Sequence, residues 1–253
     1  MGSGNGQEIF EKVARLLRQQ KEMYGDFEIS FEKQSDKDTE TQSVISEPIE
    51  EFKTESQLSI EEKLAVCETL EELKSLCEQA EVLKTDLENT NLVFGVGNPT
   101  ADLMLIGEAP GENEDLQGEP FVGKAGQLLD KIMEAINFNR SDIYIANILK
   151  HRPPNNRDPK PEEREHSLPF LLKQIDLVDP KLILCVGKIS GNTLLKKDHT
   201  LKEMRQKFHE FHGREIMVTY HPAALLRNQQ WKRPTWEDVQ MLRSRYDELG
   251  GKP

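Results

Sequence analysis

The sequence lacks long hydrophobic runs, a secretory leader and a set of paired cysteines. Among its 253 residues no apolar stretch approaches the ~20 residues that a membrane-spanning helix needs. The first ten residues, MGSGNGQEIF, have no basic segment followed by an apolar one, as a signal peptide would. Its three cysteines, Cys67, Cys77 and Cys185, lie too far apart to suggest a disulfide framework. These absences predict a cytoplasmic protein that does not contact membranes.

The net negative charge comes from one part of the chain. Residues 1–90 contain 22 acidic and 10 basic side chains, which accounts for the whole net charge of −12, and residues 91–253 contain 23 of each. Within this neutral part, six basic or imidazole side chains fall within fifteen residues: Lys150, His151, Arg152, Arg157, Lys160 and Arg164. The overall acidity therefore does not argue against a polyanionic partner.

The amino-terminal section differs in composition from the rest of the chain. Residues 8–24 place apolar side chains at helical spacing, which predicts an amphipathic helix that packs on its own domain or binds a partner. Residues 25–57 are polar and charged, as in a linker. We therefore expect an extension over residues 1–57, helical in part and otherwise disordered, and a catalytic domain over residues 58–253.

The first helix of that domain has a recognisable start. Residues 57–60, Gln-Leu-Ser-Ile, faintly resemble the start of a sliding-clamp-binding motif, but the closing aromatic residue is missing. Ser59 and Glu62 have the spacing of a capping box, which is the interpretation we favour.

From Leu103 onward, short apolar strands alternate with amphipathic helices. The predicted strands are Leu103–Gly107, Ile143–Ile148, Leu182–Gly187 and Ile216–Tyr220. The predicted helices are Lys124–Ile136, Pro161–Leu177, Lys188–Lys196 and Pro234–Leu249. This pattern is typical of an α/β fold in which helices cover both faces of a parallel sheet.

Chemically useful residues follow the ends of these strands. Glu108 follows the first strand, Asn147 ends the second, Gly187 ends the third and His221 follows the fourth. The carboxyl ends of parallel strands share one edge of the sheet, where such folds bind their ligands. With Phe121, which lies in the loop after the first strand, these residues predict a reaction site.

Each of these side chains also has a purely structural explanation. Glu108 could accept main-chain N–H bonds in its Gly-Pro turn, and Phe121 could belong to the core. Asn147 could satisfy a neighbouring loop, and His221 could cap a helix or a turn. The functional interpretation depends on their convergence at one edge.

Several stretches of the chain closely resemble the family 4 uracil-DNA glycosylases. They are GEAPGENED, GEPFVGKAGQLL, NILKHRPPNNRDP, the region of Gly187, and TYHPAALLRNQQWKRPTWEDVQ, in the right order over about residues 92–247. The resemblance implies a three-layer α/β/α sandwich with a central four-stranded parallel sheet. It also implies a hydrolase that flips uracil out of DNA, cuts its N-glycosidic bond and leaves an abasic site.

The resemblance also implies roles for individual residues. Glu108 and His221 are the expected catalytic residues. The expected substrate-binding residues are Ala109 beneath the base, Glu114, Phe121 as the stacking ring and Asn147 as the carboxamide that recognises uracil. The expected DNA-binding residues are Lys150, Arg152, Leu225, Arg227 and Lys232. The loop through Leu225, Leu226 and Arg227 resembles the segment that enters the minor groove.

The ligands of the family's usual four-iron–four-sulfur cluster are largely missing. Four cysteines hold that cluster, but here Cys77 is followed three residues on by Ala80, Lys150 is followed by His151, and Ser167 stands at the last ligand position. One thiolate cannot hold a cluster, so we expect neither an iron–sulfur cofactor nor another metal. A residual metal site formed by Cys77, His151 and His166 stays open as a weaker alternative.

Ordinary packing must then replace the cross-link that the cluster provides. The candidates are apolar residues at helical spacing: Leu73, Leu76, Ala80, Leu83 and Leu87.

Two other functions are compatible with such a fold. One is a DNA-binding or polymerase-associated module without activity, although such a module has no need for Glu108, Phe121, Asn147 and His221 together. The other is a glycosylase that attaches covalently to the abasic sugar, which we rate lower because a distinctive insertion after the second strand is missing. We expect a monomer that acts on uracil in single- and double-stranded DNA, with its range of other damaged bases left open.

Overall fold

A computed structural model describes residues 58–252, and the chain divides into two compact units, Met1–Val66 and Cys67–Pro253. In the first unit the described residues form helix α2, Ile60–Val66. The Glu62 amide donates to Ser59 Oγ at 3.2 Å, and the Ser59 amide donates to Glu62 Oε2 at 2.7 Å, which confirms the predicted capping box. The predicted helix at 8–24 and linker at 25–57 lie outside the described residues.

The second unit is built on a six-stranded sheet in the order β1-β3-β2-β4-β6-β5. Its strands are β1 Val96–Gly97, β2 Leu103–Gly107, β3 Tyr144–Asn147, β4 Leu182–Val186, β5 Phe208–Phe211 and β6 Arg214–Thr219. Strands β3, β2, β4 and β6 run parallel, whereas β1 and β5 pair antiparallel at the two edges. The predicted parallel four-stranded sheet is confirmed. The edge strands were not predicted because β1 has two residues and β5 has no continuous apolar run.

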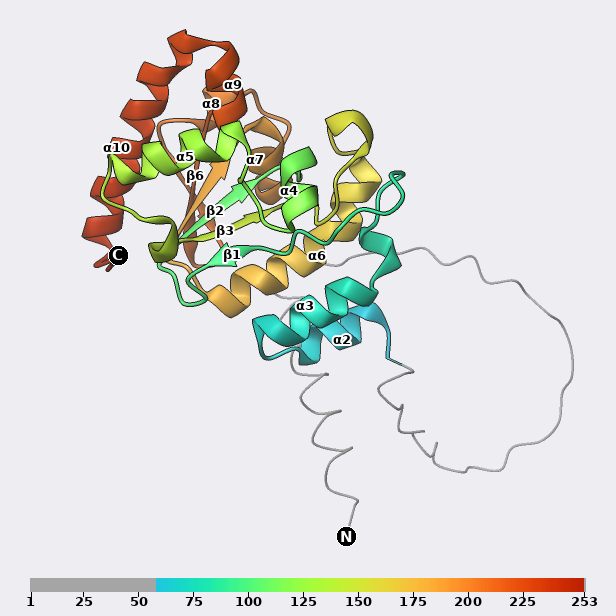
Figure 1. The fold of residues 1–253 in the computed structure, drawn as a ribbon. Coiled ribbons are helices and arrows are strands. Elements are labelled where there is room, and N and C mark those ends of the chain that lie inside the picture. Colours follow the sequence, from blue (N-terminus) through green and yellow to red (C-terminus); the bar gives the residue numbers. More distant parts are fainter. Residues whose placement is uncertain (1–57, 253) are drawn as a thin grey trace, which may run out of the picture. The chain divides into compact units, whose positions relative to one another are not determined.

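Helices cover both faces of this sheet (Figure 1). Helices α5 (Lys124–Glu134) and α10 (Lys232–Glu248) pack with their apolar side chains on one face. On the other face lie α6 (Pro161–Val178) and α7 (Lys188–Leu195), where the Gln174 amide of α6 donates to the Tyr144 hydroxyl of β3. The predicted α/β/α sandwich is therefore confirmed.

The shorter elements complete the second unit. They are α3 Leu70–Gln79, η2 Glu81–Leu83, α4 Glu112–Gln117, η3 Arg140–Asp142, η4 Pro154–Asn156, α8 Leu201–Met204, α9 Pro222–Arg227 and η5 Gln229–Trp231. The prediction that the apolar residues from Leu73 to Leu87 lie at one helical spacing is wrong, because α3 ends at Gln79 and Ala80 adopts an extended conformation. Leu73, Ala80 and Leu83 are nevertheless buried, and both α3 and η2 pack against α6.

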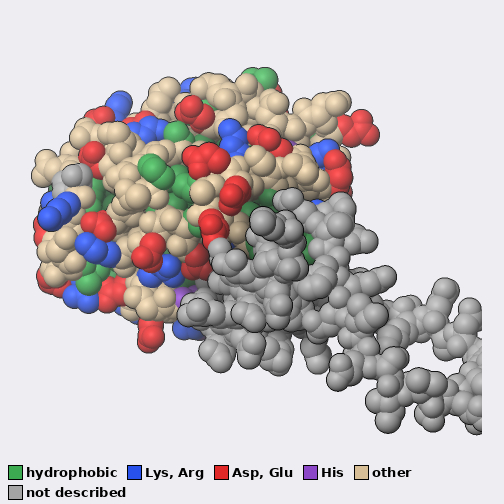
Figure 2. All heavy atoms as spheres, turned by 90° about the horizontal axis from the view of Figure 1, so that it is seen from below, with side chains coloured by type: hydrophobic (Ala, Val, Ile, Leu, Met, Phe, Trp, Pro, Cys, Tyr) green, Lys and Arg blue, Asp and Glu red, His purple; other side chains and the backbone are tan. Residues whose placement is uncertain are grey.

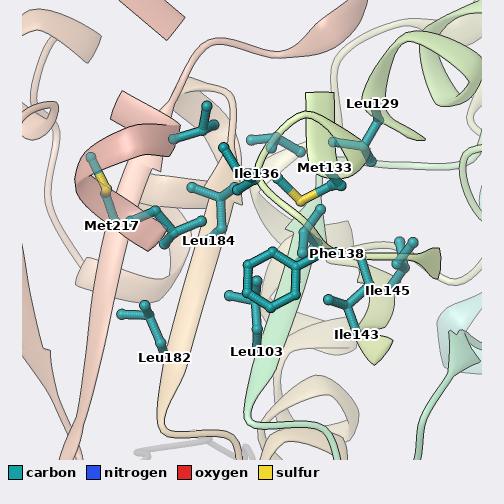
Figure 3. Close-up of a cluster of buried hydrophobic side chains, with 14 of the residues drawn as sticks. Leu103, Leu129, Met133, Ile136, Phe138, Ile143, Ile145, Leu182, Leu184 and Met217 are labelled. Carbon is teal, nitrogen blue, oxygen red and sulfur yellow. The ribbon is translucent and has the colours of Figure 1, made fainter. Parts of the chain in front are cut away.

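Alternate residues of the parallel strands form the main hydrophobic core (Figure 3). Leu103 on β2, Ile145 on β3, Leu184 on β4 and Met217 on β6 point to the same face, as the two-residue period of a strand requires. All residues of β2, β3 and β4 are buried, so these strands are covered on both sides.

The strand order creates a topological switch point at the carboxyl edge of the sheet. From β2 the chain passes through α5 to β3 on one side, and from β3 it passes through α6 to β4 on the other. The loops after β2 and β4 therefore lead away from each other, and such a switch point is where open α/β sheets bind ligands. Glu108 and Gly187 directly follow these two strands.

The described surface carries charges of both signs. On the face that Figure 2 presents, Lys and Arg side chains are interspersed with Asp and Glu side chains. Among the described helices, none is both long and apolar enough to cross a bilayer.

Candidate active site

Gly107, the last residue of β2, lies at the centre of the site. It pairs with Asn147 at the end of β3. A Cβ atom on Gly107 would lie 2.3 Å from Asn147 Oδ1 and 2.6 Å from Phe121 Cζ. The missing side chain therefore allows the carboxamide and the aromatic ring to approach the same point of the backbone.

The carboxamide of Asn147 lies in a nearly closed position and has no hydrogen-bond partner among the described residues. The residue is 2% exposed and its side chain makes no hydrogen bond to any residue that the structure describes. Its amide atoms are not among the fully buried polar atoms that lack a partner, so they keep contact with solvent. The expectation that Asn147 serves a neighbouring loop finds no support among the described residues, and the amide is available to a ligand.

Phe121 is held in an unusual backbone conformation. Its φ of 55° is left-handed, which costs a bulky residue on the order of 1–3 kcal/mol. The ring is 6% exposed and belongs to the main core cluster, as the structural alternative proposed. Its centroid also lies 5.6 Å from that of His221, with an angle of 31° between the rings. The ring therefore contributes both to the core and to the site.

Glu114 supports the loops around the site. Its Oε2 accepts a hydrogen bond from the Gly111 amide at 3.1 Å, and its Oε1 accepts from the Val122 and Gly123 amides at 3.0 and 2.9 Å. Both carboxylate oxygens are thus engaged by main-chain donors. This carboxylate ties the start of α4 to the segment after Phe121, a role that sequence reasoning did not predict.

His221 is the N-cap of α9, as the structural alternative for this residue proposed. Its Nδ1 accepts a hydrogen bond from the Ala223 amide at 3.2 Å. A nitrogen that accepts carries no proton, so the neutral ring carries its proton on Nε2. Burial, assisted by Arg227, lowers the pKa of His221 to about 4, while Glu114 opposes this shift. The ring is therefore neutral at physiological pH and offers Nε2–H as a donor.

Gly187 borders His221 from the next strand. It follows β4 with a φ of 115°, a conformation that only glycine adopts readily. Its amide donates to the Thr219 carbonyl at 2.9 Å, and a Cβ on it would lie 3.5 Å from His221 Cβ. This turn therefore keeps the end of β4 close to the imidazole.

Glu108 is partly buried beside the loop that follows β3. Burial raises the pKa of its carboxyl to about 7; Asp158 raises it further, and Arg164 lowers it. The neighbouring Ala109 is also partly buried. Glu108 consequently changes its charge near neutral pH, unlike an exposed glutamate.

The segment that carries His221 is braced by residues that the sequence did not indicate. The Tyr220 ring lies between the Arg205 guanidinium, 4.4 Å from its centroid, and the Trp231 ring, which stacks on it at 5.0 Å. Arg205 also donates to both carboxylate oxygens of the buried Asp238, at 2.7 and 3.0 Å. These contacts join residues from three separate parts of the sequence, so no local pattern predicts them.

Two expected DNA contacts are wrong. Lys150 is 0% exposed, and its Nζ donates to the carbonyls of Phe94 and Asn147 at 3.2 and 3.1 Å and to Gln174 Oε1 at 2.6 Å. It cannot reach a phosphate, because all three of its donors are used inside the protein. Leu225 is 1% exposed, since α9 packs it toward α5.

The other expected DNA-binding residues lie at the surface. Leu226, the neighbour of Leu225, is 46% exposed and is the apolar side chain that α9 presents to solvent. Arg227, which follows Leu226 directly, and Lys232, at the start of α10, are also exposed. Arg152 is partly exposed, and its Nε donates to Asn156 Oδ1 at 2.7 Å. Their contact with DNA stays a prediction.

The residues at the expected cluster positions do not fit an iron–sulfur cluster. Burial raises the pKa of the Cys77 thiol to about 12, and Ala80 offers no ligand atom. Ser167 Oγ donates to the Ile148 carbonyl at 2.7 Å, and His151 Nδ1 lies 3.0 Å from Thr90 Oγ1. In the part of the chain that the structure describes, no group of three or more His, Cys, Asp or Glu side chains could hold a metal, including Cys77, His151 and His166.

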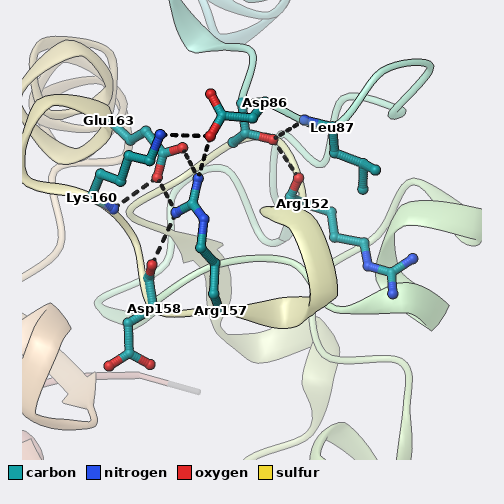
Figure 4. A network of polar contacts seen from close by, with 8 residues as sticks. Asp86, Leu87, Arg152, Arg157, Asp158, Lys160 and Glu163 are labelled. Carbon is teal, nitrogen blue, oxygen red and sulfur yellow. Dashed lines mark hydrogen bonds and ion pairs between the residues drawn. The ribbon is translucent and has the colours of Figure 1, made fainter.

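Polar contacts connect this region to the loop after β3 (Figure 4). Asp86 pairs with Arg157 at 3.2 Å and with Lys160 at 2.6 Å. Arg157 also donates to both oxygens of Glu163, at 2.8 and 2.6 Å. Thr85 Oγ1 donates to the Arg152 carbonyl at 2.6 Å. Side chains thus link the segment after η2 to the loop between β3 and α6.

Comparison with known proteins gives consistent results. The family model of the uracil DNA glycosylase superfamily matches residues 94–240. The chain is 39% identical over 184 residues to a type-4 uracil-DNA glycosylase of Archaeoglobus fulgidus, which covers 70% of this chain and 89% of that protein. It is 41% identical over 172 residues to the one of Saccharolobus solfataricus (64% and 78%), and 35% identical over 181 residues to the one of Thermotoga maritima (70% and 94%).

Proposed function

The chain belongs to the uracil DNA glycosylase superfamily, and we propose that the side chains around Gly107 are its uracil site. Its activity is the hydrolysis of the N-glycosidic bond of uracil in DNA, as part of DNA repair. The observation that carries the site assignment is that the carboxamide of Asn147, free of protein hydrogen bonds among the described residues, and the Phe121 ring approach the same point at Gly107, with a neutral His221 beside the ring.

Asn147 recognises the base by the pattern of its donors and acceptors. Its Oδ1 accepts from N3–H of uracil, and its Nδ2 donates to O4. Cytosine presents the opposite pattern, so an amide held in this orientation pairs with neither of its groups. Sites that depend on such pairing reject the wrong base strongly.

Phe121 stabilises the base after it leaves the helix. Flipping a nucleotide out of the duplex costs a few kcal/mol, and stacking on an aromatic ring returns ~1–3 kcal/mol per base. Gly107 leaves this space open, since a methyl group there would collide with both the ring and the carboxamide.

His221 and Glu108 act on the two fragments of the broken bond. Uracil departs with a negative charge, and the Nε2–H of a neutral His221 donates to its O2. The sugar develops positive charge, which an ionised Glu108 stabilises directly or by orienting the attacking water. Because the pKa of Glu108 is about 7, the enzyme gains its active form as the pH rises through neutrality.

DNA is held by the surface beside His221. Arg152, Arg227 and Lys232 neutralise phosphates, and we assign the wedge in the minor groove to Leu226 in place of Leu225. The proposal includes action on single- and double-stranded DNA by a cytoplasmic monomer. Assays on both forms of a uracil oligonucleotide check the action on DNA, and gel filtration checks the monomeric state.

We further propose that the enzyme works without an iron–sulfur cluster. Support comes from Ala80 and from the hydrogen bonds that engage His151 and Ser167. The purified protein should be colourless near 400 nm and free of stoichiometric iron, including after anaerobic incubation with iron and sulfide. Iron and sulfide at four equivalents each would contradict this proposal.

Truncation of Asn147 tests the site. Asn147→Ala should lose at least ~10²-fold in single-turnover excision without a loss of thermal stability, because its carboxamide makes no hydrogen bond in the free protein. The matched control is Asn192→Ala, which removes another buried carboxamide, one that bonds to the main chain of His199. This control should lose stability and keep its excision rate. The reverse outcome would remove Asn147 from the site.

A further inference from the structure

A charged side chain on another element grips the main chain at Phe121. Arg140, in the short helix η3, donates from Nη1 to the Phe121 carbonyl at 3.2 Å and from Nη2 to the Pro120 carbonyl. The same Nη1 donates to Asp130 Oδ1 of α5 at 3.0 Å. One guanidinium thus engages two consecutive carbonyls and is itself held by a carboxylate.

The main chain at this point needs external support. The left-handed φ of Phe121 is unfavourable for a bulky side chain, so the local sequence does not select it. Glu114 fixes the two amides that follow Phe121, and Arg140 fixes the two carbonyls at and before it. Gly126 of α5 lies against the same peptide, since a Cβ there would be 1.8 Å from the Phe121 carbonyl oxygen.

Arg140 and Asp130 lie outside the hydrophobic core, so their contact with the main chain is distinct from core packing. Its side chain is 27% exposed and that of Asp130 is 35% exposed, so the pair lies at the edge of the domain. Neither residue belongs to the main hydrophobic cluster, whereas Phe121 does. Among the described residues, the hydrogen bonds of the Arg140 guanidinium go to Asp130 and to the main-chain carbonyls of Pro120 and Phe121, so the link to the site is the Pro120–Phe121 backbone.

We propose that Arg140, oriented by Asp130, is a positioning residue that holds Phe121 in its left-handed conformation and so keeps the ring under the flipped base. This inference rests on the proposed stacking role of Phe121. Without Arg140 the two carbonyls lose their shared donor, the peptide relaxes toward ordinary φ values, and the ring leaves its place beside His221.

A double-mutant cycle tests the proposal. Arg140→Met, Phe121→Ala and the double variant are compared with the parent protein in single-turnover excision, at enzyme concentrations above and below saturation. Arg140→Met should lower the excision rate at saturation by about 10-fold, because small misplacements of a positioning group are costly. Arg140→Lys keeps the charge but lacks the planar fork of donors that engages two consecutive carbonyls, and should recover part of the rate. In the Phe121→Ala background, Arg140→Met should change the rate less than about twofold.

Arg243 offers a matched control for the loss of a partly exposed ion pair. Its side chain is 25% exposed, pairs with Asp247 at 2.7 Å and lies near main-chain carbonyls, but it is located on α10. Arg243→Met should excise uracil at the parental rate, even if it lowers the melting temperature by as much as Arg140→Met does.

The possible outcomes separate the two proposals. If Phe121→Ala excises uracil at the parental rate, the stacking role itself is wrong. If Phe121→Ala is impaired but Arg140→Met is not, Arg140 does not position the ring. Equal losses from Arg140→Met in both backgrounds would show that Arg140 acts through general stability, which also overturns the inference.

Discussion

The uracil site and the region around Cys77 lie in the same domain but differ in how their residues function. At the proposed uracil site, Asn147, Phe121 and His221 supply a carboxamide, an aromatic ring and a neutral N–H donor. Around Cys77, Ala80, His151 and Ser167 stand at the positions that the family resemblance assigns to cluster ligands. The proposed site has the groups that its chemistry needs, whereas the described residues around Cys77 form no ligand set for a metal.

The difference follows from what each region has to do. Excision requires particular atoms aimed at a base, so an exchanged side chain removes the interaction itself. A cross-link has only to connect segments of the chain, and several kinds of contact can do that. Here they include the hydrogen bond from Ser167 to the Ile148 carbonyl, the ion pairs of Asp86, and the buried faces of Leu73 and Leu83.

The largest expected effect is that of Asn147→Asp. An ionised carboxylate accepts from N3–H of uracil but cannot donate to O4, so excision should fall by ~10²-fold or more. Single-turnover assays on uracil and cytosine oligonucleotides measure both the rate and the discrimination. Uracil excision near the parental rate would show that the carboxamide does not recognise the base.

The next effect concerns Glu108 and pH. Excision should rise with pH through about 7, where this carboxyl ionises, while His221, with a pKa of about 4, contributes no change there. Glu108→Gln should be slower at pH 8 and lose this dependence. A profile with the same midpoint in Glu108→Gln would assign the titration to another group.

The Glu108 carboxyl should also make the stability of the protein depend on pH, and stability should fall as the pH rises, whereas excision should increase. Its pKa is raised on folding, so the folded state binds more protons than the unfolded state between about pH 4.5 and 7. The protonated Glu108 carboxyl makes its full contribution to the free energy of unfolding below pH 4.5, the pKa in the unfolded chain. This contribution is lost as the pH rises through about 7, the pKa in the folded protein. Glu108→Gln should therefore be more stable than the parent at pH 8, by on the order of 1–3 kcal/mol, and nearly equal to it at pH 4. Denaturant unfolding at the two pH values measures this difference.

The smallest effect is expected in the region around Cys77. Ser167→Ala removes the donor to the Ile148 carbonyl, which should lower the free energy of unfolding by about 1 kcal/mol without changing excision. Ser244→Ala is the control, because that hydroxyl bonds to a carbonyl within an exposed turn of α10. A loss of excision in Ser167→Ala well below its melting temperature would mean that this region does more than connect segments.

Much of the fold was predictable because its signals are local. The apolar runs at Leu103–Gly107 and Leu182–Gly187 predicted buried strands, which the structure has at Leu103–Gly107 and Leu182–Val186, and Ser59 with Glu62 predicted a helix start. Because parallel strands share a carboxyl edge, the positions of Asn147 and His221 in the sequence were enough to predict that they lie at the same edge of the sheet.

The tertiary structure decided which of these side chains face a ligand and which face the protein. Lys150 is basic in a basic stretch, yet Phe94 and Gln174 enclose its ammonium group. Leu225 and Leu226 are the same residue type, and only the packing of α9 separates the buried one from the exposed one. Likewise Arg140 becomes important only when folding brings it to Phe121. Burial and hydrogen-bond partners come from segments distant in sequence, so local patterns determine the elements and their order, while the contacts between elements determine what each side chain does.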